Sequence, residues 1–541
     1  MSNNKVDYLL RCTKCNKPFF TMGEKAYYEE KGYTFPHLCK KCRNRKKFNY
    51  MKKMDYAYSS KQQAKTNTMV NLYQEIVSNW SVEAKKENLS YFYNVDELQS
   101  ILDGKKAFVI GRKGSGKTSI AQHLVSQKRY DIFCQPLSFK NFPFNILYGL
   151  NNRDYTEPNQ YISIWKYLII SYICKKMISN NNIDESIRNQ LGKIYGDNPE
   201  KSLKMVIGKW TSKNFGIQVM GSGIQYGGER QESKLPWLDT SEILENVIKK
   251  YCDDSYYYIV FDELDEDYKD FSSEKEEREY KCMLTSLFKA VQDIRSTFDD
   301  LEMHIYPVVF LRSDIYNQLT DSDKNKWRES IVDMEWNTSK IQQMLAHRLC
   351  VAIDCEETDF NNIWFKVFEN TKVKMGNRQG RDISIYKYIE RSTEMRPRDF
   401  VQYIKVCAQL SLERGEKLIS PKTVKDADES FSDYLYAETI DELFAVIPEI
   451  REILGLLSTI RKQSFKYSTF EQEYNNLVEQ GKIPARDVKW ILLKLFDAGV
   501  IGNQPTMKNQ SVFRFSNKSP RFNYNEPMLV HRGLFKALQI F

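Results

Sequence analysis

The residues best suited to chemistry stand in the octet GRKGSGKT, residues 111–118, whose spacing is G-x-x-x-x-G-K-[ST]. An apolar stretch at residues 107–110 favours a strand directly before it, and SIAQHLVSQ favours a helix directly after it. Glycines let backbone amides approach phosphate oxygens, and the helix N-terminus adds a favourable dipole. We therefore predict a phosphate-binding loop for ATP. Its expected nucleotide ligands are Gly111, Gly114, Ser115, Gly116, Lys117 and Thr118.

Hydrolysis would also need a metal ion and a base beside this loop. Lys117 is expected to reach the β- and γ-phosphates, and Thr118 is expected to coordinate Mg²⁺. The apolar run at residues 256–261 favours a second strand, and it ends in Asp262 and Glu263. We predict that Asp262 holds Mg²⁺ through water, and that Glu263 is the base that orients the attacking water.

Other charged residues near these motifs leave alternatives open. Asp265 and Glu266 could join the metal shell, although facing solvent is the favoured interpretation. Arg312 ends a third apolar run, residues 305–311. From the tip of a strand, its guanidinium could sense the γ-phosphate and assist catalysis. The alternative is that Arg312 only pairs with Asp314.

Two further arginines flank a proline at which a helix is expected to begin. Proline is favourable at a first helical position, and Pro397 has Arg396 and Arg398 on either side. From a helical lid either side chain could reach back to the nucleotide, so both are predicted to bind it. Arg328 and Arg348 are candidates for an arginine finger, but no motif anchors either of them.

A different chemistry is expected near the N-terminus, where four of the 11 cysteines form two C-x-x-C pairs. Two such pairs can surround Zn²⁺ tetrahedrally and leave no open position, which predicts a structural site. Metal binding would supply folding energy that so short a segment lacks. The alternative is a redox C-x-x-C, but no βαβ pattern surrounds it. The expected zinc ligands are Cys12, Cys15, Cys39 and Cys42.

The formal charge of the chain is concentrated in the same segment. The whole chain carries +9, and residues 1–55 alone hold 14 Lys/Arg against 5 Asp/Glu. Phe48 and Tyr50 lie among these basic residues, and aromatic rings can stack on bases while cations meet phosphates. We predict a nucleic acid or an acidic protein as the partner of this arm. A solubilising tail is the alternative.

The chain of 541 residues is long enough for several domains, and 28% charged residues with few prolines and glycines exclude a collagen-like or wholly disordered chain. The expected class is multidomain α/β. Apolar stretches are too short to span a bilayer, and residues 1–12 lack an apolar signal core. We therefore expect a cytoplasmic protein with no membrane contact.

The pattern along the chain predicts five segments. They are a zinc ribbon with a basic tail at 1–55, a linker and lead-in helix at 56–90, an αβα core at 91–335 with a helical insertion at 161–250, a helical lid at 336–428 and a winged-helix-like domain at 429–541. A β-hairpin is expected within residues 215–230, and SVFRFS is expected to form a strand. Domains of the last type bind DNA or pack against proteins.

Residues 12–47 resemble a small zinc-ribbon family. The matching pattern places two C-x-x-C pairs around a G-E-x-x-x-[FY]-x-x-x-G-[FY] core and ends in Arg. Its positions in this chain are Gly23, Glu24, Tyr28, Gly32, Tyr33 and Arg43. Such modules are often accessory, and the resemblance by itself does not imply nucleic-acid binding.

Residues 90–541 resemble AAA+-like and STAND-like ATPases, the group that includes origin-recognition proteins and innate-immunity switches. The resemblance rests on GRKGSGKT, VFDELDE, VFLRSDIYNQL with KWRESIVDMEW, MRPRDF and VHRGLFKAL, which together look like a bacterial P-loop ATPase family. It implies an ATP-driven conformational switch with ATP and Mg²⁺ as cofactors, and for several relatives a role in antiviral defence. Assembly into homo-oligomers is compatible with this resemblance.

Three functions remain open at this point. The favoured one is an ATP-hydrolysing switch whose zinc-bearing arm contacts nucleic acid or a partner. The first alternative is an initiator, loader or repair ATPase that acts on DNA with the same motifs. The second is a scaffold that binds ATP without hydrolysing it, although intact Lys117, Thr118, Asp262 and Glu263 argue against it.

Overall fold

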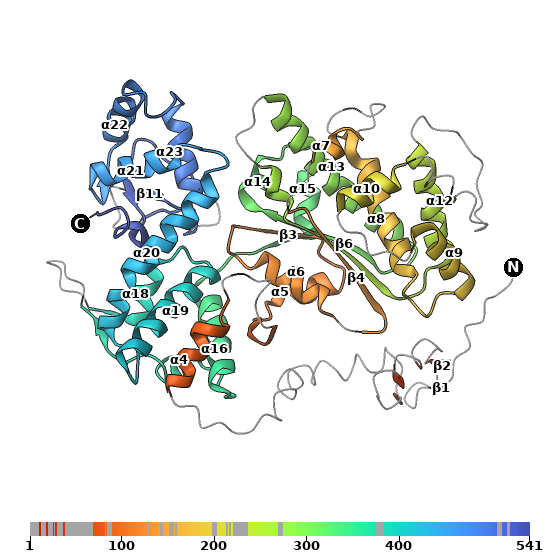
Figure 1. The fold of residues 1–541 in the computed structure, drawn as a ribbon, viewed down its shortest axis with the longest axis horizontal. Coiled ribbons are helices and arrows are strands. Elements are labelled where there is room, and N and C mark those ends of the chain that lie inside the picture. Colours follow the sequence, from red (N-terminus) through yellow and green to blue (C-terminus); the bar gives the residue numbers. More distant parts are fainter. Residues whose placement is uncertain are drawn as a thin grey trace.

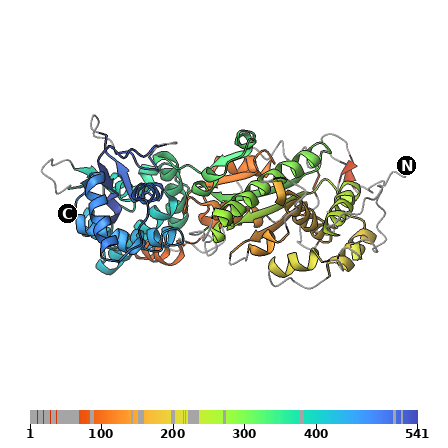
Figure 2. The same ribbon diagram turned by 90° about the horizontal axis from the view of Figure 1, so that it is seen from above.

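The computed structural model describes most of the chain from residue 69 onward. Its described ranges are 69–81, 89–127, 129–140, 144–150, 159–196, 203–212, 236–268, 274–374, 382–505, 511–516 and 520–540, with isolated residues between and before them. Two bodies lie side by side, a sheet with its helices and a mainly helical body that ends near the C-terminus (Figure 1). The view from above shows the same two bodies along the long axis (Figure 2).

A parallel five-stranded sheet forms the centre of the first body, in the order β4-β5-β6-β3-β7. Its strands are β3 (Phe108–Gly111), β4 (Ile132–Ser138), β5 (Tyr256–Asp262), β6 (Ile305–Arg312) and β7 (Ile331–Asp333). The three strands expected at 107–110, 256–261 and 305–311 are thereby confirmed. Their continuous apolar runs are typical of parallel strands, which are covered on both faces.

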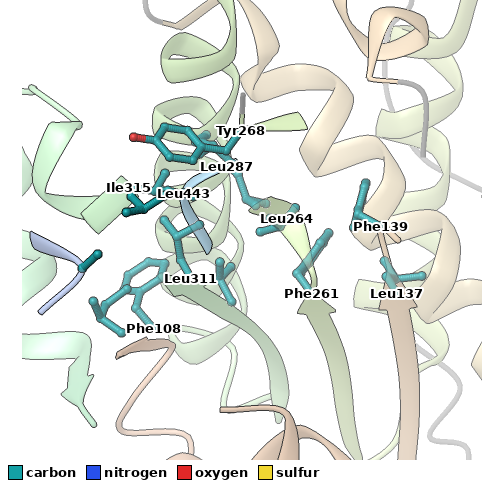
Figure 3. Packing of buried hydrophobic residues seen from close by; sticks show 14 of the residues in the cluster. Phe108, Leu137, Phe139, Phe261, Leu264, Tyr268, Leu287, Leu311, Ile315 and Leu443 are labelled. Atoms are coloured by element: carbon teal, nitrogen blue, oxygen red, sulfur yellow. The ribbon is translucent and has the colours of Figure 1, made fainter. Parts of the chain in front are cut away.

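Alternate residues of each strand reach opposite faces of the sheet, and each face has its own apolar cluster. On one face, Val109 and Val260 pack with α5 (Asp96–Leu102) and α6 (Lys117–Val125). On the other, Phe108, Phe261 and Leu311 pack with residues of the neighbouring helices (Figure 3). The covering helices there include α8 (Ile162–Met177) and α13 (Glu274–Asp299).

The helical insertion expected at residues 161–250 is present, between β4 and β5. It contains α8, α9 (Glu185–Tyr195), α10 (Leu203–Trp210) and α12 (Pro236–Tyr251). Most of the hairpin expected within residues 215–230 lies outside the described residues, and its described positions, Phe215, Gln218 and Val219, are helical instead. Short elements complete this body: α7 (Asn145–Tyr148), η3 (Asn159–Tyr161), η4 (Leu264–Asp267), α14 (Ser313–Gln318), α15 (Lys324–Trp327) and η5 (Arg328–Ser330).

The second body begins with the helices expected to form a lid. They are α16 (Thr338–Ile353), α17 (Phe360–Trp364), α18 (Ile385–Ser392), α19 (Pro397–Arg414) and α20 (Pro421–Leu443). Strands β8 (Lys372–Val373) and β9 (Ile383–Ser384) form a short antiparallel ribbon among them. The lead-in helix α4 (Met69–Asn79) packs against α19 and α16, after which η2 (Leu89–Tyr91) follows.

The domain boundary expected between residues 428 and 429 falls inside α20. Ser420 caps this helix by accepting a hydrogen bond from the Thr423 amide, and Pro421 occupies its first turn. No further Pro or Gly follows until Leu443, so the helix continues through the expected boundary.

The C-terminal residues form three helices and a small antiparallel sheet in the order β10-β12-β11. The elements are α21 (Ile450–Ile460), β10 (Ser464–Phe465), α22 (Tyr467–Glu479), α23 (Val488–Asp497), β11 (Ile501–Asn503), β12 (Met528–Val530) and η6 (Arg532–Leu534). The prediction that SVFRFS forms a strand is wrong. Only Val512 of this segment makes a β-bridge, to Asn503, and residues 514–516 form a turn. Because β12 already pairs with one edge of β11, this turn ends the pairing along the other edge of β11.

Near the N-terminus the structure describes one short antiparallel pair, β1 (Leu10–Arg11) with β2 (Pro18–Phe19). Among the helices of the described residues, none is both long enough and apolar enough to span a membrane.

Candidate nucleotide-binding site

The predicted phosphate loop joins β3 to α6 in a tight turn. Gly114 and Gly116 have φ of 79° and 95°, a region that side chains disfavour. Gly116 also caps α6, so the free amides at that helix N-terminus face the loop. A Cβ at Gly111 would lie 2.5 Å from Ser115 Oγ, which explains the need for glycine where the loop closes.

The backbone of the loop is held from outside by Trp336, whose indole Nε1 donates to the Ser115 carbonyl at 2.8 Å. The hydroxyl of Ser115 is buried, and Oγ has no hydrogen-bond partner within the part of the chain that the structure describes. An unsatisfied buried hydroxyl beside a helix N-terminus fits a loop built to receive a phosphate oxygen.

Lys117 folds back over this loop. Its ammonium donates to the carbonyls of Gly111 and Arg112 at 2.9 and 3.0 Å. Burial lowers the pKa of Lys117, and the nearby Asp265 carboxylate opposes this shift. The desolvated cation therefore lies where a phosphate would supply the missing negative charge.

Thr118 and Asp262 are neighbours at the predicted metal position, close enough for the Thr118 side chain to lower the pKa of the Asp262 carboxyl. Burial raises the pKa of Asp262, and the charge of Glu263 raises it further. A hydroxyl beside a buried carboxylate is an oxygen donor set that fits Mg²⁺, and a divalent cation would favour the ionised carboxylate. These two residues would hold the ion.

Glu263 follows β5 in a left-handed backbone conformation, with φ of 61°. Its amide donates to Asp262 Oδ1 at 3.0 Å, and its carboxylate accepts a hydrogen bond from the Ser138 hydroxyl at the end of β4. The strand tips of β4 and β5 thereby fix the direction of the predicted base.

Arg312 lies at the end of β6, between the strands that carry the loop and the acidic pair. Its guanidinium makes two hydrogen bonds to Asp314, at 2.7 and 3.1 Å, and an ion pair with Asp265 at 3.5 Å. Asp265 therefore pairs with Arg312, contrary to the expectation that it faces solvent. The charge of Arg312 also lowers the pKa of Lys117, which places the two cations near each other.

Arg396 and Arg398 both lie against the phosphate loop. A Cβ at Gly114 would lie 3.3 Å from Arg398 Cβ and 3.5 Å from Arg396 Cδ. Arg396 is buried and its Nη1 lies 3.5 Å from the Lys113 carbonyl, whereas Arg398 pairs with Glu438 at 2.8 Å.

Carboxylates that sequence reasoning missed surround Arg396. Asp399 lies 3.1 Å from its Nε, and Glu394 and Glu442 lie 3.4 and 3.5 Å from its Nη1. Glu394 also pairs with Arg112 of the loop. The motif MRPRDF contained a signal for Asp399, but nothing in the sequence marks Glu442 or Ser138.

The two arginine-finger candidates differ in exposure. Arg348 is buried with its guanidinium over Trp80 at 4.9 Å and Tyr91 at 5.6 Å, which excludes it from reaching a neighbouring molecule. Arg328 is exposed in η5, directly before β7.

The predicted zinc ligands Cys12, Cys15, Cys39 and Cys42 lie outside the described residues. A family model described as a probable treble clef domain matches residues 6–50. This corrects the expected zinc ribbon to a different arrangement of the same kind of zinc-finger module.

A second family model, the FunZ-associated C-terminal helical domain, matches residues 339–439, which span α16 to most of α20. No curated protein matches this chain. Neither family model covers half of the chain.

Three similar solved structures come from Pyrobaculum aerophilum and Aeropyrum pernix. Cdc6p from Pyrobaculum aerophilum is 12% identical with a TM-score of 0.28, over 90% of this chain and 96% of that one. The Aeropyrum pernix ORC2 protein is 11% identical with a TM-score of 0.33, over 82% and 89%. The Aeropyrum pernix ORC1 protein in complex with DNA is 11% identical with a TM-score of 0.34, over 87% and 96%. These TM-scores are low, so the likeness does not establish a function for this chain.

Proposed function

We propose that this chain is a P-loop ATPase that uses hydrolysis to change the contact between its two bodies. One observation carries the proposal. Lys117 and Thr118 begin α6 directly beside Asp262 and Glu263 at the tip of β5, while Arg312 ends the strand between them. This is the set of groups that phosphoryl transfer to water requires.

Each side chain has one role in this proposal. The loop amides and Lys117 bind the β- and γ-phosphates, and Thr118 and Asp262 hold Mg²⁺, which would neutralise phosphate charge when bound. Glu263 accepts a proton from the water that it orients. Arg312 stabilises charge that develops on the γ-phosphate oxygens.

Contacts between the loop and the second body support a switch. Arg112 lies over the ring of Phe515 at 5.4 Å and donates to the Glu394 carbonyl at 3.1 Å. Arg396 and Arg398 approach the loop from α19. A nucleotide that moved this loop would therefore disturb contacts with both the lid and the C-terminal residues.

A second candidate is an ATPase that acts on DNA, as an initiator, loader or repair enzyme. The C-terminal order of three helices with a β10-β12-β11 sheet favours a winged-helix domain, in which α23 would enter a DNA groove. Lys489 on α23 is exposed, which supports this candidate. Hydrolysis stimulated by DNA would favour it. The expected role in antiviral defence gains no support from these observations.

Two substitutions test the ATPase. Lys117→Ala should weaken ATP binding at least tenfold because it removes a phosphate contact. Glu263→Gln should keep ATP bound and stop turnover, measured by isothermal titration and phosphate release. Equal loss of binding in both variants would contradict the role of Glu263. Tight ATP binding without turnover in the unchanged chain would favour the non-hydrolysing scaffold.

The arginines are tested separately. Arg312→Ala should lower turnover more than Lys422→Ala, an exposed position of α20. Arg396→Ala and Arg398→Ala should behave in the same way as Arg312→Ala. Turnover equal to that of the unchanged chain in all three variants would remove them from the site.

A further inference from the structure

Glu442, one residue before the end of α20, lies between two of the arginines assigned to the nucleotide. Its Oε1 is 3.9 Å from Arg312 Nη2, and its Oε2 is 3.5 Å from Arg396 Nη1. The side chain is 13% exposed, so these pairs form in a partly desolvated place. One carboxylate therefore bridges the end of β6 and the start of α19.

Apolar packing, in addition to the ion pairs of Glu442, holds the end of α20 against the sheet body. Leu443 is buried in the same apolar cluster as Ile315 and Leu311, and Figure 3 shows it beside Ile315. Glu442 is thus held at the strand tip, within the ring of charges around Lys117 and Arg312.

Both arginines keep closer partners without Glu442. Arg312 has Asp314 at 2.7 Å, and Arg396 has Asp399 at 3.1 Å. The bridge to Glu442 is the longest ion pair that each guanidinium makes. Since Coulomb attraction falls with distance, this bridge is the one that a competing anion would replace first.

We infer that Glu442 is an internal stand-in for the terminal phosphate of ATP. It occupies Arg312 and Arg396 while that phosphate is absent, and the γ-phosphate of bound ATP displaces it. A phosphate carries more negative charge than a carboxylate, and repulsion between the two groups would move the end of α20 away. ADP lacks the γ-phosphate and leaves the bridge in place. This inference rests on the proposed ATPase function.

Displacement of Glu442 would affect the C-terminal residues through α20. The Ser432 hydroxyl accepts a hydrogen bond from the Ala537 amide at 2.9 Å, and Asp428 pairs with Arg532 at 3.3 Å. A shift of α20 would therefore either move the last residues of the chain with it or break their contacts.

The test compares affinities for ADP and for a non-hydrolysable ATP analogue in the full chain. Glu442→Gln keeps the shape of the side chain and removes its charge. It should raise affinity for the ATP analogue roughly tenfold, a typical size for coupling between sites, and leave ADP affinity unchanged. The matched control is Glu429→Gln, an exposed position on the same helix, which should change neither affinity.

The outcomes separate this inference from the proposed function. If neither nucleotide binds the unchanged chain, the ATPase proposal fails. If both bind, but Glu442→Gln shifts neither affinity or shifts both equally, only the stand-in role fails. The variant should fold, since both arginines retain other carboxylates.

Hydrogen exchange gives a second readout that does not depend on affinity. In the unchanged chain, the ATP analogue should speed amide exchange at residues 439–443, whereas ADP should not. In Glu442→Gln, exchange there should already be fast without nucleotide. Equal exchange in all of these states would overturn the inference.

Discussion

The hydroxyl of Ser138 donates a hydrogen bond to the carboxylate of Glu263, across the tips of the neighbouring strands β4 and β5. Ser138 is also the register partner of Asp262, the residue before Glu263. The direction of the predicted base is therefore set by a strand that carries no other residue assigned to the site.

We expect Ser138→Ala to lower kcat roughly tenfold, because the carboxylate loses a charge-assisted hydrogen bond that orients it toward water. ATP affinity should stay unchanged, since Ser138 is not assigned to the phosphates. Ser138→Thr keeps the hydroxyl and should restore most of the rate. An unchanged kcat in Ser138→Ala, measured by phosphate release, would contradict this role.

Stability in acid should depend on His531, which is buried and packs edge-on against the stacked rings of Phe513 and Phe515. Burial lowers the pKa of His531 from 6.5 to about 4. The unfolded chain takes up a proton near pH 6.5, whereas the folded chain resists it down to about pH 4. Lowering the pH across this window therefore favours unfolding, by about 3 kcal/mol in total.

His531→Gln removes this titration, so its free energy of unfolding should fall less steeply between pH 6.5 and 4. Urea unfolding at a series of pH values measures both slopes. The comparison uses the slope with pH, because the variant can also differ in absolute stability. Parallel slopes would show that His531 does not titrate in this way.

Purified protein should contain about one zinc ion per chain, because two C-x-x-C pairs make a closed thiolate site. Cys39→Ser should lose the metal, and Cys134→Ser, far from these pairs in the sequence, should keep it. Elemental analysis of each protein checks the prediction. Much less than one zinc in the unchanged chain would remove the site.

Removing residues 1–55 should weaken binding to single-stranded DNA or RNA at low salt and flatten its dependence on salt. Each neutralised phosphate makes the negative slope of log affinity against log salt steeper by about 0.9 for duplex DNA, and by about 0.7 for single strands. ATP affinity is the internal control and should not change. Unchanged nucleic-acid affinity would make an acidic protein surface the better partner for this arm.

The strands that end at the site were predictable because each is an unbroken apolar run with a polar residue at its tip. That pattern marks Asp262 and Arg312 directly, and the octet marks the loop. Edge strand β4 was not predicted, because Gln135 and Pro136 interrupt its apolar pattern. Which strands become neighbours depends on the order of the whole sheet.

The partners of the arginines were harder to predict for the same reason. Arg312 with Asp314 is a local pair, two residues apart in the sequence, and this spacing alone indicates it as an alternative to a nucleotide contact. Glu442 lies 130 positions after Arg312, and only the packing of α20 on the sheet body brings them together. The treble clef was also missed, since two C-x-x-C pairs are common to several zinc folds.

Because α20 is a single helix of 23 residues, it is a lever about 34 Å long. Its last turn lies at the strand tips, and a point about a third of the way along it is attached to α19 through the hydrogen bond between Tyr403 and Asp428 at 2.7 Å. Around such a pivot, a tilt of about 10° displaces the far end of the helix by about 4 Å. The gain or loss of one phosphate can thus produce movements of several ångströms, large enough to change how another macromolecule binds.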